Sequence, residues 1–444
     1  MTQVWVGLVG TVLVAWAACG TYWSYDPSGW AQPVVAALGD AVPHEVSRVL
    51  MVVGFALLCW AWWTLRPRDG VPQRHGAWTV LAVWAAPLLL VPPVLTADPF
   101  AYADSGWLFL HGQNPYAVGY GAIGGPFAAS VDPLWRGVGV AYPPLQFLLN
   151  AAIVGLTGAH PYWSVVALRL PALAGVALLA ACLPRCARLL GLPPAAATWL
   201  GVLNPLVVVH FLGGAHNDAV MVGVSVLAVW VTLRARGTRH AAWWHLLVAP
   251  AIVGVAMALK QQAGLTVIAV AGLPVAGALT AATAGRRVWL WAWRLTVVTA
   301  VAVGVFVVVS VVTGLGFGWV EWMDQMGRTG SAAPFNLLGQ LVSIVAPDIG
   351  IYRILGVVST VCMLGVLVLF FVRFVDAPLR WLGWGALWFT ILGSALHPWY
   401  VVWPLALLAL TPLRIRSRMA LVVFVVAFGL WNALQTVLFA SAPL

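Results

Sequence analysis

The sequence predicts an all-α polytopic membrane protein, and three observations support this prediction. Of the 444 residues, 62% are hydrophobic and only 8% are charged, which leaves too little polar side chain to cover a soluble domain. Apolar stretches of about 20 residues, the length that crosses about 30 Å of hydrocarbon, recur along the whole chain. These stretches are continuous in Ala, Val, Leu and Trp rather than alternating, so membrane helices are expected instead of barrel strands.

Thirteen apolar segments have the length of a membrane helix, so a bundle of about 13–14 spans in one domain, 1–444, is predicted. The segments cover residues 3–22, 46–65, 77–96, 163–183, 193–212, 217–234, 241–259, 264–284, 288–313, 350–372, 380–396, 398–412 and 419–440. No basic residue precedes the first segment, so we interpret it as a first membrane span, with an uncleaved signal-like segment as the alternative.

Arginines cluster in the loops between alternate segments. The clusters are Arg66, Arg68 and Arg74; Arg185 and Arg188; Arg234, Arg236 and Arg239; Arg286 and Arg287; Arg373 and Arg380; and Arg414, Arg416 and Arg418. Cytoplasmic loops are rich in Lys and Arg, so these loops are placed inside. The formal net charge of +10 follows from this bias and does not indicate a nucleic-acid partner.

Two apolar segments do not fit this alternation as simple spans. A full crossing by residues 142–158 would place every later arginine cluster outside, so we expect a short re-entrant or half-buried helix there. Residues 335–346 are expected to behave in the same way.

Most acidic residues fall on or near the side opposite the arginines. They are Asp26, Asp40, Glu45, Asp98, Asp104, Asp132, Asp218, Glu321, Asp324 and Asp348, whereas Asp69 and Asp376 lie on the arginine side. Because the positive-inside rule concerns only Lys and Arg, the acidic outer face is a separate indication of chemistry there.

The longest loop, residues 97–141, contains the first candidate residues. It is rich in aromatic residues and Gly, which argues against disorder, and loops of this length in compact proteins are commonly functional. Asp98 directly follows an apolar segment, where a carboxylate is expensive to desolvate. It is a candidate catalytic base, although capping of the next helix is an equal alternative. Asp104 is the second candidate, and Tyr102 is expected to contact substrate.

The second candidate segment is a turn between two apolar runs. Gly213 and Gly214 break the helices, and His216, Asn217 and Asp218 follow at the outer edge. Adjacent polar groups at this depth are costly unless they face a cavity, so a substrate site is predicted, with a simple turn as the alternative. His and Asp also ligate metals, but further ligands would have to come from elsewhere.

Two isolated cations and one aromatic motif complete the candidates. Lys260 is the only lysine, and Arg169 lies inside an apolar segment. Each is a candidate ligand of a lipid phosphate, with a side chain that snorkels to the membrane interface as the alternative. His397 and Trp399 stand at the outer boundary, where an aromatic ring could stack on a sugar. The five cysteines lie in or beside apolar runs without paired spacing and indicate neither a disulfide framework nor a metal site.

These segments together resemble the actinobacterial polyprenyl-phosphomannose-dependent α-1,6-mannosyltransferases. The matching runs, in chain order, are DPFAYADSGWLFLHGQNPY, AYPPLQFLL, NPLVVVHFLGGAHNDAVMVG, ALKQQAG and HPWYVVWPL. The resemblance covers roughly residues 95–405 and is most specific at GGAHND. It departs from the family at His397, where Gln is usual, and in the YPP run, where Gly is frequent.

The resemblance implies a GT-C glycosyltransferase with an outward-facing site in a bacterial plasma membrane. The implied donor is polyprenyl-phosphate mannose, and the implied acceptor is a mannan or phosphatidylinositol mannoside of the lipomannan and lipoarabinomannan pathway. Asp98 matches the acid that opens the first outer loop and would be the base, with Asp104 as the second candidate. Lys260 and Arg169 would bind the donor phosphate. His216, Asn217 and Asp218 would bind sugar hydroxyls or the acceptor. No cofactor is expected, and a divalent metal stays open as the alternative.

Two other functions stay open at the level of sequence. A polyprenyl-phosphoarabinose-dependent arabinosyltransferase would use a similar set of residues. A lipid or sugar transporter, such as a flippase, would carry buried charges and broken helices, although no internal repeat is seen and the polar residues lie at one face.

Overall fold

The computed structural model describes residues 2–21, 33–68, 75–328, 331–346 and 350–438. Over these ranges the chain is helical, and the only extended pairing is an isolated bridge between Tyr120 and Arg136. The all-α prediction is confirmed. Four residues named in the topology prediction, Asp26, Asp69, Arg74 and Asp348, lie outside the described ranges.

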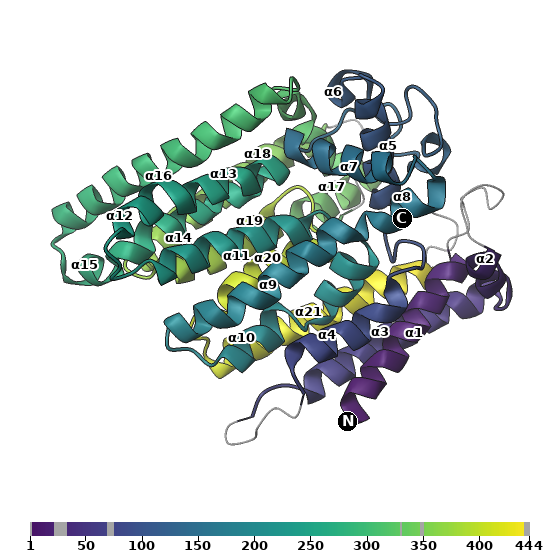
Figure 1. Cartoon of the computed structure of the whole chain (residues 1–444), viewed down its shortest axis with the longest axis horizontal. Coiled ribbons are helices and arrows are strands. Elements are labelled where there is room, and N and C mark those ends of the chain that lie inside the picture. Colours follow the sequence, from purple (N-terminus) through teal and green to yellow (C-terminus); the bar gives the residue numbers. More distant parts are fainter. Residues whose placement is uncertain (1, 22–32, 69–74, 329–330, 347–349, 439–444) are drawn as a thin grey trace.

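The N-terminal half contains the long loop and the short helices α5 to α8, which lie together at the upper right of Figure 1. Its elements are α1 (Thr2–Thr21), α2 (Pro33–Asp40), α3 (His44–Thr64), α4 (Ala77–Ala85), η1 (Ala86–Leu88), α5 (Asp98–Leu110), α6 (Pro115–Val118), η2 (Ala128–Ser130), α7 (Pro144–Leu156), α8 (Pro161–Ala167), α9 (Arg169–Leu189), α10 (Pro194–Gly201), η3 (Val207–Gly213) and α11 (Asp218–Arg234).

The C-terminal half contains the longest membrane helices. Its elements are α12 (Ala241–Trp243), η4 (Trp244–Val248), α13 (Ala249–Leu259), η5 (Gln261–Thr266), α14 (Val267–Gly272), η6 (Leu273–Val275), α15 (Ala276–Ala281), α16 (Ala284–Val312), η7 (Gly318–Arg328), α17 (Pro334–Val345), α18 (Ile351–Arg373), α19 (Pro378–Leu392), η9 (Pro398–Val401), α20 (Val402–Leu408) and α21 (Ile415–Leu438).

Eight helical stretches of the described chain are long and apolar enough to cross a membrane. They are Thr2–Gly20, His44–Thr64, Pro161–Leu189, Ala241–Leu259, Gln261–Ala281, Ala284–Val312, Ile351–Arg373 and Ile415–Gln435. A ninth would be formed by η3 and α11, which are bent by 113° at the break between them. The chain is therefore a multi-pass membrane protein.

The other predicted spans are shorter or broken, so fewer helices than predicted cross on length alone. In 77–96 the helical structure ends at Leu88, and in 380–396 it ends at Leu392. Proline explains several of the breaks, because it removes a backbone donor and clashes with the preceding turn. Pro92 and Pro93 follow the first of these helices and Pro205 separates α10 from η3. Hydropathy counts apolar residues and does not detect such breaks.

The two segments expected to be short or re-entrant are short helices. Helix α7 has 13 residues and α17 has 12, whereas a perpendicular crossing needs about 20. Helix α7 packs on α5, at the end of the molecule that carries the long loop (Figure 1).

The long loop and three of the arginine-bearing turns lie at opposite ends of the bundle (Figure 1). Helices α5 to α8 lie at one end. The turns from α9 to α10, from α11 to α12 and from α15 to α16, which carry or adjoin seven of the clustered arginines, lie at the other. The bundle thus has one end rich in candidate site residues and one end rich in positive charge.

Close packing of α9 on α11 fixes the polar turn at the start of α11. A Cβ added at Gly175 would lie 2.3 Å from the carbonyl oxygen of Ala219, and one at Gly223 would lie 2.3 Å from that of Gly175. Small residues allow helix backbones to approach this closely in membranes. The first turn of α11, which carries Asp218, is therefore held firmly against the bundle.

Candidate active site

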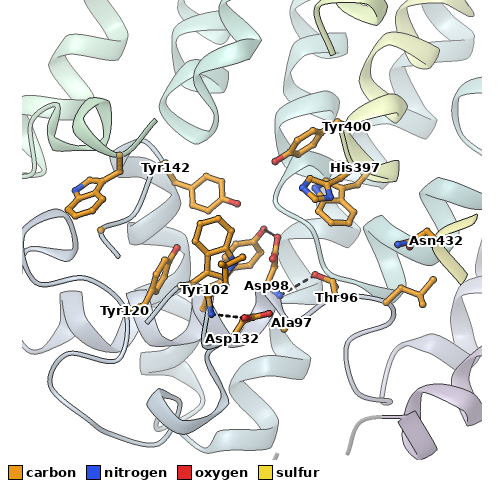
Figure 2. A pocket seen from close by; sticks show the side chains of 18 of the residues that line it. Thr96, Ala97, Asp98, Tyr102, Tyr120, Asp132, Tyr142, His397, Tyr400 and Asn432 are labelled. Atoms are coloured by element: carbon orange, nitrogen blue, oxygen red, sulfur yellow. Dashed lines mark hydrogen bonds between the residues drawn. The ribbon is translucent and has the colours of Figure 1, made fainter. Parts of the chain in front are cut away.

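A cavity of about 380 Å³ opens at the N-terminal end of α5 (Figure 2). Its wall comes from the long loop, from the η9 turn and from the end of α21. Aromatic side chains dominate the lining: Tyr102, Tyr120, Trp135, Tyr142, Trp322, Trp399 and Tyr400. Two carboxylates, Asp98 and Asp132, also line it. A concave cavity that combines aromatic rings with carboxylate, amide and hydroxyl groups is typical of a substrate site.

Asp98 occupies the first position of α5, directly before Pro99. The N-cap is Ala97, which makes no side-chain capping bond, so the expected alternative, that Asp98 itself caps the helix, does not apply. The backbone N–H of Asp98 donates to Oγ1 of Thr96 at 3.1 Å. The Asp98 side chain is 26% exposed and faces the cavity (Figure 2).

Two side chains contact the same oxygen of the Asp98 carboxylate. The hydroxyl of Tyr102, one helical turn later, donates to Oδ2 at 3.1 Å, and Nδ1 of His216 lies 3.4 Å from Oδ2. Burial raises the pKa of Asp98. The hydrogen bond and charge of His216, with the charges of His397 and Lys260, lower it by more, so the pKa lies below its ordinary value. The carboxylate is therefore ionised at neutral pH.

A stack of three rings lies beside Asp98. Trp399 is sandwiched by His216, at a centroid distance of 3.8 Å, and by His397, at 4.6 Å, with interplanar angles of 17° and 4°. His216 is fully buried, whereas His397 and Trp399 line the cavity. Burial lowers the pKa of His397 to about 4, so this imidazole is uncharged at neutral pH. The rings of Trp399 and His397 therefore face the cavity, and His216 lies behind Trp399.

Lys260 and Asp218 form a buried ion pair. Nζ lies 2.7 Å from Oδ2 of Asp218, and both side chains are almost entirely buried. Lys260 stands in extended conformation (φ −156°) between α13 and η5, so its side chain leaves the helix axis toward α11. The ammonium also lies 4.4 Å from the ring centroid of Tyr400 and 5.6 Å from that of Tyr142, distances at which cation–π attraction operates.

Lys260 lines a second cavity, of about 460 Å³. The two cavities share three wall residues, Ala141, Tyr142 and Tyr400. Beyond this wall the second cavity is lined mainly by apolar side chains, including Leu265, Met323, Met363 and Phe389. Figure 2 shows Tyr142 and Tyr400 on opposite sides of the first cavity, each with its hydroxyl directed inward. The Asp98 carboxylate thus lies at one cavity and the Lys260 ammonium at the other, and the two cavities meet at Tyr142 and Tyr400.

Five predicted site residues do not line either cavity: Asp104, Arg169, His216, Asn217 and Asp218. Asp104 is fully buried and its Oδ2 accepts from the N–H of Gly121 at 2.7 Å, and burial raises its pKa to about 6. Arg169 is buried and donates to the carbonyl oxygens of Leu212 (3.1 Å), Pro92 (3.0 Å) and Gly213 (2.7 Å). The Asn217 amide oxygen lies 3.5 Å from the Tyr102 hydroxyl. These contacts hold the loop and the η3–α11 bend in shape.

Sequence reasoning did not select several residues that line the cavity. Tyr120, Tyr142 and Tyr400 are tyrosines of loops or turns. Their position beside apolar segments was an available signal, because a phenol that becomes buried usually finds a polar partner. Asn432 and Gln435 come from α21, more than 300 residues from Asp98 in the chain. Nothing local distinguishes them from other polar residues of a membrane helix.

No group of three or more His, Cys, Asp or Glu side chains within the described residues could hold a metal ion. Asp98 and His216 are close, but Asp218 is paired with Lys260. The charged groups that line the two cavities are the carboxylates of Asp98 and Asp132 and the ammonium of Lys260, and aromatic rings form much of the wall around them.

Comparisons with known proteins identify the family. Residues 4–276 match the family described as alpha-(1->6)-mannopyranosyltransferase, N-terminal domain, and residues 329–433 match the MptB C-terminal domain. The chain belongs to the alpha-(1->6)-mannopyranosyltransferase family. The resemblance predicted from the sequence motifs is thus confirmed, and the chain is a membrane glycosyltransferase.

Curated relatives in the family cover most of the chain. Alpha-(1->6)-mannopyranosyltransferase A of Mycobacterium tuberculosis is 30% identical over 80% of this chain and 69% of its own length. Alpha-(1->6)-mannopyranosyltransferase B of Corynebacterium glutamicum is 26% identical over 96% and 75%. A probable alpha-(1->6)-mannopyranosyltransferase of Mycolicibacterium smegmatis is 29% identical over 95% and 82%. No solved structure matches the chain.

Proposed function

We propose that this chain transfers mannose from polyprenyl-phosphate mannose to a growing α-1,6-mannan, with inversion at the anomeric carbon. The reaction would take place at the extracytoplasmic face of a bacterial plasma membrane. The observation that carries the proposal is an ionised carboxylate, Asp98, facing an aromatic cavity one wall away from a buried ammonium, Lys260. The relatives named as alpha-(1->6)-mannopyranosyltransferases support the mannosyl donor and the mannan acceptor.

Asp98 is the proposed general base. It takes the proton from the acceptor hydroxyl as the acceptor oxygen bonds to C1 of the mannosyl group. The leaving group is a phosphate, which needs no proton, so one carboxylate suffices where glycoside hydrolases use two. Attack from the face opposite the phosphate turns a β-linked donor into an α-linked product.

Lys260 is the proposed cation beside the departing phosphate. A positioned cation in a dry site stabilises the charge that develops as the C1–O bond breaks. Asp218, which the motif suggested as a sugar ligand, accepts from the ammonium at 2.7 Å. Its proposed role is to orient Lys260 and to offset the cost of burying it.

The two cavities suit different parts of the substrates. The cavity of about 460 Å³ beside Lys260 has mainly apolar walls, as a prenyl phosphate requires. The cavity of about 380 Å³ beside Asp98 has Trp135, Trp322 and Trp399 in its wall, flat faces that suit the C–H side of a pyranose. The mannosyl carbon would lie where they meet, between Tyr142 and Tyr400. Tyr102, His397 and Trp399 would contact the acceptor sugar.

An assay with purified protein in detergent tests the function. The substrates are labelled polyprenyl-phosphate mannose and a short α-1,6-mannoside, and the control is Asp98→Asn. We expect a product longer by one α-linked mannose from the wild type and very little from the variant. A protein that uses only the arabinosyl donor would be an arabinosyltransferase, and one that forms no product with either donor would contradict the proposal.

The side of the membrane is tested by labelling. Leu134 lines the first cavity and is 49% exposed. We expect Leu134→Cys in intact cells to react with a membrane-impermeant maleimide, while the parent chain with its five native cysteines gives the background. Reaction only after the membrane is opened would place the site on the cytoplasmic side.

A further inference from the structure

His216 lies where it can act on the base but not on the sugar. It is fully buried beneath Trp399, with ring centroids 3.8 Å apart, and it does not line the cavity. Its Nδ1 is 3.4 Å from Oδ2 of Asp98. The sequence suggested a sugar ligand at this position, whereas the geometry directs the imidazole at a single carboxylate oxygen.

The local backbone is built to place this ring. The η3 segment is a π-helix, and Ala215, between it and α11, has a left-handed conformation with φ +52°. At Gly214 a Cβ would lie 2.7 Å from the carbonyl oxygen of His210 and 3.1 Å from Cδ2 of His216. A left-handed conformation is strained for alanine, and such strain persists where the surrounding structure requires the conformation.

The proton on the His216 ring can be assigned from its neighbours. An ionised carboxylate only accepts hydrogen bonds, so the proton belongs on Nδ1, facing Asp98. Both ring nitrogens are buried without a hydrogen-bond partner among the described residues, and Oδ2 of Asp98, 3.4 Å from Nδ1, is the acceptor that this nitrogen approaches. The 3.4 Å separation is long, as catalytic hydrogen bonds commonly are before substrate binds.

Both donors to Asp98 contact the same oxygen. The Tyr102 hydroxyl and His216 Nδ1 both lie against Oδ2, while the side chain faces the cavity with 26% of its surface exposed. With Oδ2 engaged, Oδ1 is the oxygen available to an acceptor hydroxyl.

We propose that His216 is a positioning residue for the base: its Nδ1–H holds Oδ2 of Asp98, keeps the carboxylate ionised in an aromatic cavity, and leaves Oδ1 to take the acceptor proton. This inference rests on the proposed function of Asp98. In the reaction the acceptor O–H bond breaks and its proton moves to Oδ1. The acceptor oxygen bonds C1, and the C1–O bond breaks with its electron pair leaving on the phosphate.

The other titratable groups around this pair come from several elements. They are Tyr102 of α5, Tyr120, Asp132 and Tyr142 between α6 and α7, His210 of η3, Asp218 of α11, Lys260 after α13, and His397 and Tyr400 of the η9 turn. Of the two residues that contact Oδ2, Tyr102 is a phenol and His216 an imidazole. Removal of the imidazole should therefore change the protonation of Asp98 more than removal of His397 or Lys260, whose charges act on it less.

The test is the pH dependence of transfer by the full chain in three variants. His216→Leu removes the donor, and His216→Asn keeps an N–H near the Nδ1 position. His210→Leu is the control: it removes a buried histidine that also lies against Trp399 but is not among the groups that lower the pKa of Asp98. We expect the acidic limb of kcat/KM to move up by about one pH unit or more in His216→Leu. It should stay near the wild-type position in His216→Asn and in His210→Leu.

A second readout does not depend on turnover. Infrared spectra recorded during a pH titration report the carboxylic acid band of Asp98, assigned by its loss in Asp98→Asn. We expect the band to appear at higher pH in His216→Leu than in the wild type. Should leucine prevent folding, His216→Phe removes the same donor and carries the same prediction.

The outcomes separate this inference from the proposed function. An equal loss of activity at every pH, with the band at its wild-type pH, would mean that His216 only supports the fold and would overturn the inference. A wild type that transfers no mannose, but whose Asp98 band shifts as described, would contradict the function and leave the pairing of His216 with Asp98 intact.

Discussion

Asp98 and Asp104 lie six residues apart on the same helix, α5, and their surroundings differ in every respect that matters for catalysis. Asp98 faces a cavity, and histidine and lysine charges hold its pKa below the ordinary value in spite of burial. Asp104 is buried behind the loop, bonds a backbone N–H of Gly121, and has a pKa raised to about 6 by burial. The comparison teaches that position relative to the cavity and to cations, and not residue type, selects the base.

The largest expected effect separates these two aspartates. Asp98→Asn should fold normally and lose about 10²–10⁴-fold in transfer rate, the usual contribution of a general base. Asp104→Asn should stay within about tenfold of the wild type, because an amide oxygen can still accept from Gly121. Steady-state rates of both variants, measured beside the wild type, check the contrast. Similar losses in the two variants would remove the distinction.

The next largest effect concerns Lys260. Lys260→Met should weaken donor binding and lower the rate by about 10²–10³-fold, the range for loss of one group that stabilises a developing anion. It also strands the buried carboxylate of Asp218, which destabilises the fold. The double variant Lys260→Met, Asp218→Asn should recover thermal stability without recovering activity. Recovery of both would show that the cation serves the fold alone.

A smaller effect is expected at His397. This imidazole is uncharged at neutral pH, since burial lowers its pKa to about 4, and glutamine has a similar capacity for neutral hydrogen bonding. His397→Gln should therefore reduce kcat/KM by less than tenfold near pH 7, measured with acceptor in varied concentration. A loss of the size expected for Asp98→Asn would give His397 a part in the chemistry.

The smallest effect is on stability and comes from Asp104. Its pKa in the folded protein, about 6, exceeds the ordinary value of 3.8, so folding takes up a proton between these values. Stability should therefore fall as pH rises from about 4 to 6. Asp104→Asn should reduce the difference between the melting temperatures at pH 4.5 and pH 7. An unchanged difference would mean that another group causes it.

The sequence predicted which segments are helical and apolar, because hydropathy and length are local properties. It also predicted Asp98, Lys260 and the GGAHND turn as neighbours of the site, since polar residues next to membrane helices are costly without a reason to be there. It did not predict that the Arg169 guanidinium would donate hydrogen bonds to three backbone carbonyl oxygens. Nor did it predict that Asp218 would pair with Lys260, which follows it by 42 residues in the chain. Such partners depend on how bent helices pack, which local patterns do not encode.

The most direct test of the account is a single-turnover experiment on Asp98→Asn with donor bound in advance. The account predicts that the variant binds polyprenyl-phosphate mannose as tightly as the wild type, because Lys260 and the apolar cavity are intact. Transfer to an excess of mannoside acceptor should then be slower by at least about 100-fold. Transfer at the wild-type rate in that single turnover would contradict the assignment of Asp98 as the base.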